Sequence, residues 1–155
     1  MAVTIERVSA PTDEVRRLIA ELDQALTGPY LPEQHHYLPL EQLFEGNVRF
    51  FVARVDGEAV GCGGVAFYDG FAEVKRMYTR TTVRRQGVAS ALLRRLEDEA
   101  TDAGYSLLRL ETGVHQAEAL GFYERAGFER CDVFGDYAVM PPQSIETSVF
   151  YEKTI

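Results

Sequence analysis

Apolar residues recur along the chain with two different periods, which separate predicted strands from predicted helices. Alternation over Val3–Val8 predicts a first strand. Pro11–Glu14 then provides a helix cap and first-turn acids, and Gly28-Pro29 ends the helix. The apolar face between them has the three- and four-residue spacing of a helix packed on a core. It is formed by Val15, Leu18, Ile19, Leu22 and Leu26.

Three further strands are expected in the middle of the chain, joined by two tight turns at Asp56-Gly57 and Asp69-Gly70. Their ranges are Val48–Val55, Ala59–Tyr68 and Phe71–Arg80. The second of these strands contains three glycines, at positions 61, 63 and 64. No helix follows them in a dinucleotide-binding pattern, so we expect a bulge or a close approach of two backbones.

The segment Tyr30–Gly46 has little periodicity and is interpreted as a loop with a short helix around Pro39–Phe44. A long irregular segment within a compact domain is often a binding element. His35-His36 suggests a metal site, but adjacent side chains do not easily face one ion, and no other Cys/His pair has ligand spacing. We therefore expect no metal.

The second half of the chain begins with a helix that ends at Gly104 and buries Val88, Leu92, Leu96 and Ala100 on one face. Further elements follow: a buried strand at Leu107–Thr112, a helix at Gln116–Ala126 ended by Gly127-Phe128, and two strands at Cys131–Phe134 and Ser148–Thr154. The Met140–Pro142 stretch between the last two strands is expected to be a loop.

Length and composition predict one domain over residues 1–155 and narrow the choice of compartment. At 155 residues the chain can bury a single core, and no run approaches the roughly 20 apolar residues of a membrane span. The beginning of the chain has no basic stretch followed by an apolar core, so no secretion signal is expected. Cys62 and Cys131 lack any disulfide or metal spacing. Two free thiols in a reducing cytoplasm are the simplest interpretation.

The net charge of −8 argues against nucleic acid as a partner, but the charge is unevenly distributed. No acidic residue occurs between Val74 and Leu96. This stretch holds Lys75, Arg76, Arg80, Arg84, Arg85, Arg94 and Arg95. A local cationic zone in an acidic protein suits a compact polyanion, although a solvated helix face also accounts for Arg94 and Arg95.

The cationic zone contains a strand-to-helix turn, Val83–Leu93, with a glycine at position 87. The first backbone N–H groups of a helix have no intrahelical partner, and the helix dipole adds positive potential there. An anion such as a phosphate is the expected occupant. The pattern Arg84-x-x-Gly87-x-Ala89 resembles the signature of the GNAT superfamily of acyl-CoA-dependent N-acyltransferases, and the order of predicted elements is similar to the GNAT core over nearly the whole chain.

This resemblance implies a fold and a cofactor. The fold would be mixed α/β (α+β), with a mostly antiparallel sheet of about seven strands and about four helices. The cofactor would be acetyl-CoA, the acyl donor, with its pyrophosphate on main-chain amides of the turn. The residues implied in cofactor binding are Met77, Tyr78 and Thr79 on the strand, Arg84, Arg85, Gln86, Gly87, Val88, Ala89 and Ser90 in the turn, and Gln116 and Tyr123.

The stretch Gln116–Phe128 is similar to a second family motif, N-x-x-A-x-x-L-Y-x-x-x-G-F. Tyr123 occupies the position of the tyrosine that protonates the leaving thiolate in many members. Gln116 stands where the family usually has Asn, which leaves the contact to the pantetheine arm open. The alternative for Tyr123 is a core aromatic on an apolar helix face.

Two carboxylates are candidates for the general base. An alkyl ammonium has a pKa near ~10.4 and must lose a proton before its nitrogen can attack a thioester. Glu73 lies eleven residues before Arg84, a spacing similar to that of the base in some family members. Glu111, at the end of the following strand, is the rival. Glu73 could instead simply pair with Lys75 or Arg76 on a wet sheet face.

The expected reaction is direct attack by a primary amine of a small molecule or a protein, because neither cysteine lies in a nucleophile motif. The acceptor pocket is expected from Tyr30–Gly46 and the Phe134–Ile145 loop, and the resemblance makes a homodimer plausible. Two other functions remain open. One is a catalytically silent acyl-CoA-binding regulatory module. The other is a nucleotide-phosphate enzyme, which the missing Lys-Ser/Thr after the turn disfavours.

Overall fold

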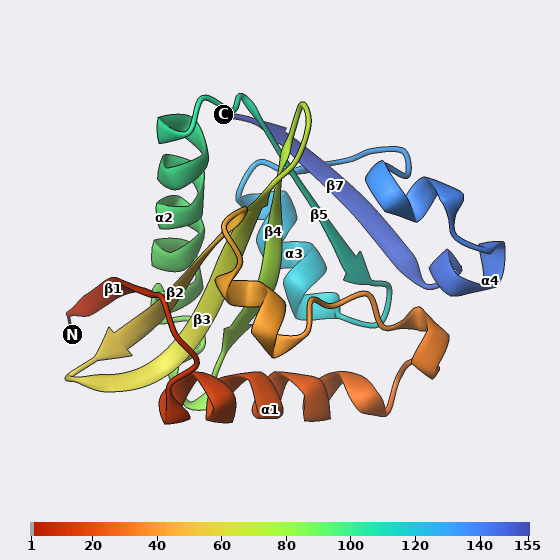
Figure 1. Ribbon diagram of the computed structural model, residues 1–155. Coiled ribbons are helices and arrows are strands. Elements are labelled where there is room, and N and C mark those ends of the chain that lie inside the picture. The colour runs from red at the N-terminus through yellow and green to blue at the C-terminus, as the bar shows by residue number, and fades with distance from the viewer. Residues whose placement is uncertain (1) are drawn as a thin grey trace.

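A seven-stranded mixed sheet forms the centre of the computed structural model, which describes residues 2–155 (Figure 1). The strands are β1 (Val3–Val8), β2 (Val48–Val55), β3 (Glu58–Phe67), β4 (Ala72–Thr79), β5 (Leu107–Gly113), β6 (Glu129–Arg130) and β7 (Ser148–Thr154). They lie in the order β1-β2-β3-β4-β5-β7-β6. Every neighbouring pair is antiparallel except β4 and β5, which are parallel. The mixed α/β class expected from the sequence is confirmed.

Four α-helices cover the two faces of the sheet: α1 (Asp13–Thr27), α2 (Val88–Asp102), α3 (Ala117–Arg125) and the short α4 (Pro142–Ile145). The side chain of Thr12 caps α1 by accepting a hydrogen bond from the Val15 N–H at 3.2 Å, as the sequence predicts. Short 3₁₀ helices occur at η1 (Pro32–Gln34), η2 (Leu40–Phe44), η3 (Thr81–Val83) and η4 (Gly135–Val139). Within residues 2–155 no helix has the length and apolarity needed to cross a membrane.

Alternation along the strands divides the core into two layers. On β2, Phe51 belongs to the same core cluster as Leu92 of α2 and Tyr123 of α3. Its neighbour Phe50 points the other way, into the layer that holds Leu18 of α1. Successive strand residues face opposite sides of a sheet, so α1 covers one face while α2 and α3 cover the other.

The sheet opens between its two parallel strands. β4 and β5 pair only at Ala72↔Leu108 and Glu73↔Arg109, close to where both strands begin. Figure 1 shows the two strands separating toward their carboxyl ends, with α3 beside the gap. Side chains from both faces of the sheet can therefore meet in this opening.

A bulge in β4 brings one more side chain to the α1 face. The β3–β4 register shifts between Cys62 and Gly64, and Arg76 has a positive φ of 57°. A Cβ atom on Gly61 would lie 2.9 Å from the Tyr78 carbonyl oxygen, so two backbones approach closely here, as the glycines indicated. The guanidinium of Arg76 reaches Asp23 on α1, at 2.6 Å.

Two predictions for the last third of the chain are wrong. Cys131–Phe134 is not a strand. β6 covers only Glu129–Arg130, and the chain leaves the sheet after the Cys131 N–H donates to the Phe150 carbonyl at 3.0 Å. Its apolar residues do not alternate between two buried faces, because Phe134 packs inward while Val133 is 38% exposed. The stretch after Met140 also contains a helix, α4, begun by Pro142.

Candidate functional site

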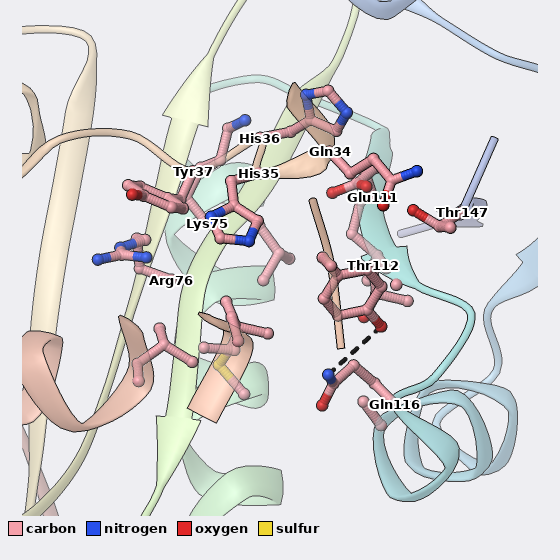
Figure 2. Close-up of a pocket in the computed structure, with 18 of the residues that line it drawn as sticks. Gln34, His35, His36, Tyr37, Lys75, Arg76, Glu111, Thr112, Gln116 and Thr147 are labelled. Atoms are coloured by element: carbon pink, nitrogen blue, oxygen red, sulfur yellow. Dashed lines mark hydrogen bonds between the residues drawn. The ribbon is translucent and has the colours of Figure 1, made fainter. Parts of the chain in front are cut away.

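Two cavities meet at the opening between β4 and β5. The larger, about 520 Å³, runs from the end of β4 past the turn before α2 and along α3; we call it the outer groove. The smaller, about 160 Å³, lies between β4, β5 and the loop at residues 30–46; we call it the inner cavity (Figure 2). Both are lined by Leu22, Leu26, Met77, Gln116, Ala119 and Tyr123. Because they share these residues, the two cavities are adjacent.

The outer groove includes the predicted anion-binding turn. Gly87 is the N-cap of α2 and has a φ of +85°, while Arg85 before it has a φ of 65°. A Cβ atom on Gly87 would meet nothing within 4 Å, so the glycine serves the backbone conformation rather than a close contact. The amides of residues 85–90 find no protein acceptor in the part of the chain that the structure describes. The turn thus offers unpaired donors at the positive end of a 15-residue helix.

Arg84 connects this turn to α3. Its guanidinium donates to the Thr79 carbonyl and to Glu118, each at 3.3 Å. Both side chains of the Arg84–Glu118 pair are well exposed, so the pair adds little stability. Arg84 is therefore free to turn toward another anion in the groove.

Tyr123 stands where the two cavities join. It is 7% exposed, and its hydroxyl makes no hydrogen bond to any group in residues 2–155. Burial raises the pKa of Tyr123, so the phenol stays protonated at neutral pH. The core-aromatic alternative describes its ring, which packs against Phe128 and Tyr151. The residue nevertheless lines both cavities, and its hydroxyl keeps a proton that it can donate.

The side chain of Gln116 is held by Tyr30. Its Nε2 donates to Tyr30 Oη at 3.3 Å, the contact drawn as a dashed line in Figure 2. The His115 N–H donates to the same oxygen at 3.0 Å. A Cβ atom on Gly113 would overlap Tyr30 Oη, so glycine is required for this approach. Tyr30, which the sequence placed only in a loop, is buried and connects that loop to the residues that begin α3.

Glu73 is buried rather than on a wet face, with 3% exposure. Its Oε2 accepts a hydrogen bond from Tyr137 Oη at 2.8 Å and pairs with Lys75 Nζ at 2.9 Å. Lys75 also donates to Tyr137 Oη at 2.9 Å, which closes a three-membered network. The partner expected in the alternative reading, Lys75, is thus present, while Arg76 pairs with Asp23 instead. Burial and the nearby carboxylates raise the pKa of Tyr137, which keeps it a donor to Glu73.

Glu111 reaches the inner cavity from β5 and has fewer side-chain partners than Glu73. Ser148 Oγ donates to its Oε2 at 2.7 Å. Burial raises the pKa of Glu111, and the Glu73 carboxylate acts in the same direction, whereas the Ser148 hydrogen bond, His36 and Lys75 oppose the shift. Figure 2 shows Glu111 and Thr112 on one side of the cavity, with His35 and Arg76 on the other.

The loops that the sequence assigned to the acceptor pocket do line the inner cavity. Gln34, His35, His36 and Tyr37 come from the first loop, and Tyr137 comes from the Phe134–Ile145 loop. Thr147, which also lines the cavity, lies just outside the predicted range. His36 Nε2 lies 2.6 Å from the Ser144 carbonyl of α4, so the two segments brace each other. Lys75 was considered as a partner of Glu73 from the sequence, whereas Tyr137 was not. The spacing of Lys75 two residues after Glu73 on a strand is the only sequence signal for that pair.

Comparisons with known proteins agree with this geometry. The profile of the Acetyltransferase (GNAT) family matches residues 15–128. A protein of Azospirillum brasilense named IAA acetyltransferase is 43% identical, over 99% of this chain and 98% of its own. A Klebsiella pneumoniae structure assigned as an acyl-CoA N-acyltransferase is 36% identical, with a TM-score of 0.75 over 98% of this chain and 97% of its own. A Thermoplasma acidophilum PaiA N-acetyltransferase, solved with coenzyme A, shares the fold at 17% identity and a TM-score of 0.75, over 100% of both chains.

Proposed function

Because the chain belongs to the GNAT family of acetyltransferases, we propose that it transfers an acetyl group from acetyl-CoA to a primary amine by direct attack. One observation carries this proposal. The outer groove, which ends at the unpaired amides of α2, joins the inner cavity at the opening between β4 and β5, beside Tyr123. A donor in the groove and an acceptor in the cavity would meet there.

Acetyl-CoA is the proposed donor, and the groove offers suitable contacts along its length. The amides of residues 85–90 would bind the pyrophosphate, with Arg84 and Arg85 beside them. The edge of β4 at Met77, Tyr78 and Thr79 is not paired with β5, so its backbone groups can bond to the pantetheine arm. A backbone N–H near Met77 can polarise the thioester carbonyl. The coenzyme A in the Thermoplasma acidophilum relative is consistent with a groove of this kind.

The amine would react in three steps. A carboxylate takes one proton from the ammonium, and the freed nitrogen attacks the thioester carbon. The C–S bond then breaks as Tyr123 protonates the departing thiolate, and the second proton lost by the acylated nitrogen restores the Tyr123 phenol. The inner cavity holds two carboxylates that can accept the first proton. Glu73 is the one indicated by its place in the sequence. Glu111 has a raised pKa and fewer occupied oxygen positions, which favours it as the acceptor of that proton, with Glu73 holding Lys75 and Tyr137 in place.

Neither cysteine is suited to a covalent acetyl-enzyme. Cys62 is fully buried, and burial raises its pKa to about 12. Burial also raises the pKa of Cys131 to about 11. Because the thiolate is the nucleophile, both thiols would be inert near neutral pH. Initial rates with both substrates varied should therefore give intersecting lines rather than the parallel lines of a ping-pong reaction.

The test is release of free thiol from acetyl-CoA in the presence of a broad panel of primary amines. We expect turnover with at least one amine, and a large loss in Tyr123→Phe. Tight coenzyme A binding without turnover on any amine would instead favour the acyl-CoA-binding regulatory module. That outcome would contradict the catalytic proposal while leaving the groove assignment intact.

A further inference from the structure

Three buried side-chain nitrogens lack a hydrogen-bond partner among residues 2–155, and all three belong to residues that line the inner cavity. They are His35 Nε2, Arg76 Nε and Arg76 Nη1. Burying a polar donor without a partner destabilises a fold, and a guanidinium is especially costly to leave unpaired. Such groups are rare in native proteins and call for an explanation. Their clustering at one cavity points to a ligand group that completes them.

The position of Arg76 is held by the fold rather than by its own pairing. The bulge in β4, with a φ of 57° at Arg76, places this side chain on the same face as Lys75. Asp23 on α1 pairs only with Nη2, at 2.6 Å, and the side chain is 2% exposed. The guanidinium therefore keeps unpaired N–H groups on Nε and on Nη1, and either of them can donate to an anion.

Tyr37 packs against the Arg76 guanidinium. The Arg76 Cζ atom lies 4.5 Å from the centre of the Tyr37 ring, and Figure 2 shows the ring beside the guanidinium at the cavity edge. Tyr37 is 40% exposed and comes from the loop at residues 30–46, not from the sheet. A shift of its side chain toward solvent would open Arg76 to the cavity and would leave β4 in place. His35 lies beside it, with ring centres 5.8 Å apart.

We propose that the acceptor carries a carboxylate in addition to its amine, and that Arg76 and His35 bind this carboxylate. This inference rests on the proposed acetyl transfer and specifies its substrate class. The charges of the cavity fit an acceptor of both signs: Glu73 and Glu111 suit the ammonium end, and Arg76 and His35 suit the carboxylate end. A monoanion fits better than a phosphate dianion, because Asp23 already offsets part of the Arg76 charge and two further carboxylates lie nearby.

The cavity also sets the size of the acceptor. Its volume of about 160 Å³ is close to the ~150 Å³ of a cavity that holds one benzene molecule. A small amino acid fits this space. We therefore expect α- or ω-amino acids of a few carbons to be the preferred acceptors, over amines of the same length without an acid.

The experiment compares each amino acid with its own carboxamide, which keeps the shape and removes the charge. Glycine, β-alanine, 4-aminobutyrate, L-alanine and L-leucine are each assayed beside the matching amide, by thiol release from acetyl-CoA. A charge-assisted hydrogen bond corresponds to about a 10- to 100-fold preference in kcat/KM. We expect this preference for at least one acid in the unmodified protein, its collapse to about onefold in Arg76→Met, and partial retention in Arg76→Lys.

Arg80→Met is the matched control. Arg80 also pairs with an acid on α1, Glu21 at 3.0 Å, but it lines neither cavity. Its loss should leave the acid-to-amide ratio unchanged. Thermal unfolding and coenzyme A titration check whether Arg76→Met is folded. His35→Gln, which does not alter the sheet, provides a second test of the acid-to-amide ratio.

Outcomes separate this inference from the function on which it rests. Turnover of amines with equal rates for acid and amide, or a preference that survives in Arg76→Met, overturns the carboxylate site and leaves the acetyltransferase proposal standing. If no amine is acetylated, binding of 4-methylpentanoate and its amide is compared by calorimetry with coenzyme A present. Selective binding of the acid that depends on Arg76 would uphold the carboxylate site alone, and equal binding would overturn it.

Discussion

Replacing Gly87 with glutamate should weaken the binding of coenzyme A by roughly 100-fold, because it changes both the backbone and the charge of the turn. Gly87 has a φ of +85°, and a Cβ atom there meets nothing within 4 Å, so the new side chain fits sterically. The left-handed backbone costs a non-glycine residue about 1 kcal/mol. This cost is shared by every replacement and can be measured separately in Gly87→Gln.

The charge contributes more than the backbone. A carboxylate about 6 Å from a phosphate charge, at an effective dielectric constant of about 20, gives a repulsion of about 3 kcal/mol. Salt at the exposed turn reduces this figure, whereas the second phosphate charge increases it. The two effects roughly offset each other, and about 3 kcal/mol corresponds to a Kd weakened roughly 100-fold. Added salt should narrow the difference between Gly87→Glu and Gly87→Gln.

Isothermal titration with coenzyme A measures the effect, and the chain offers a closely matched control. Gly57, in the turn between β2 and β3, has a φ of +83° and equally open surroundings. Gly57→Glu imposes the same backbone cost and the same charge away from the groove, so its affinity should be normal. If Gly87→Glu binds coenzyme A as tightly as Gly57→Glu, while both remain folded, the turn is not the pyrophosphate site.

Three further predictions concern the inner cavity and its walls. Tyr123→Phe should lower kcat by about 100-fold with little change in coenzyme A affinity, because only the donated proton is lost; an unchanged kcat would return Tyr123 to a purely structural role. Glu111→Gln should raise the unfolding temperature at pH 7–8 more than at pH 4, because a carboxyl whose folded pKa is raised loses its stabilising contribution as pH rises through that pKa. The same substitution should remove the acidic limb of the pH profile of kcat/KM. If Glu73→Gln removes that limb and Glu111→Gln does not, Glu73 is the base. Gly113→Ala should lower the free energy of unfolding by about 1–3 kcal/mol, because the new Cβ would overlap Tyr30 Oη. Gly46→Ala, where the space is open, should change it little. Equal stabilities of the two variants in a urea titration would show that Tyr30 moves freely.

Local physics allowed much of the fold to be predicted from the sequence. The period of apolar residues located α1, α2 and the first four strands, and the cap at Thr12 and the glycine at position 87 marked where two helices begin. These features depend on neighbours within a few residues. The failed prediction at Cys131–Phe134 came from the same rule, because Phe134 is buried by ring contacts with Phe71 and Tyr137 rather than by a strand.

The site was only partly predictable because its contacts join distant segments. The turn and Tyr123 came from motifs, but the pairing of Glu73 with Tyr137 spans 64 positions, and that of Tyr30 with His115 spans 85. The three glycines indicated an irregularity in β3, yet they did not show that Arg76 would turn onto the α1 face. Tertiary packing decides such pairs, and a single sequence contains no record of it.

The early end of the β4–β5 pairing also affects how the protein can change. An interior strand usually forms main-chain hydrogen bonds with a neighbour on each side. After Glu73, the edge of β4 that faces β5 is not paired with it, although β4 lies in the middle of the sheet. Point substitutions replace side chains and leave peptide groups in place, so this edge persists through most mutations. The inner cavity, in contrast, is lined by side chains such as His35, Arg76 and Tyr137, and a single codon change can replace each of them. The unpaired edge of β4 therefore resists mutation, whereas the inner cavity can be changed one side chain at a time. This makes the protein a favourable starting point for directed evolution toward new acceptors.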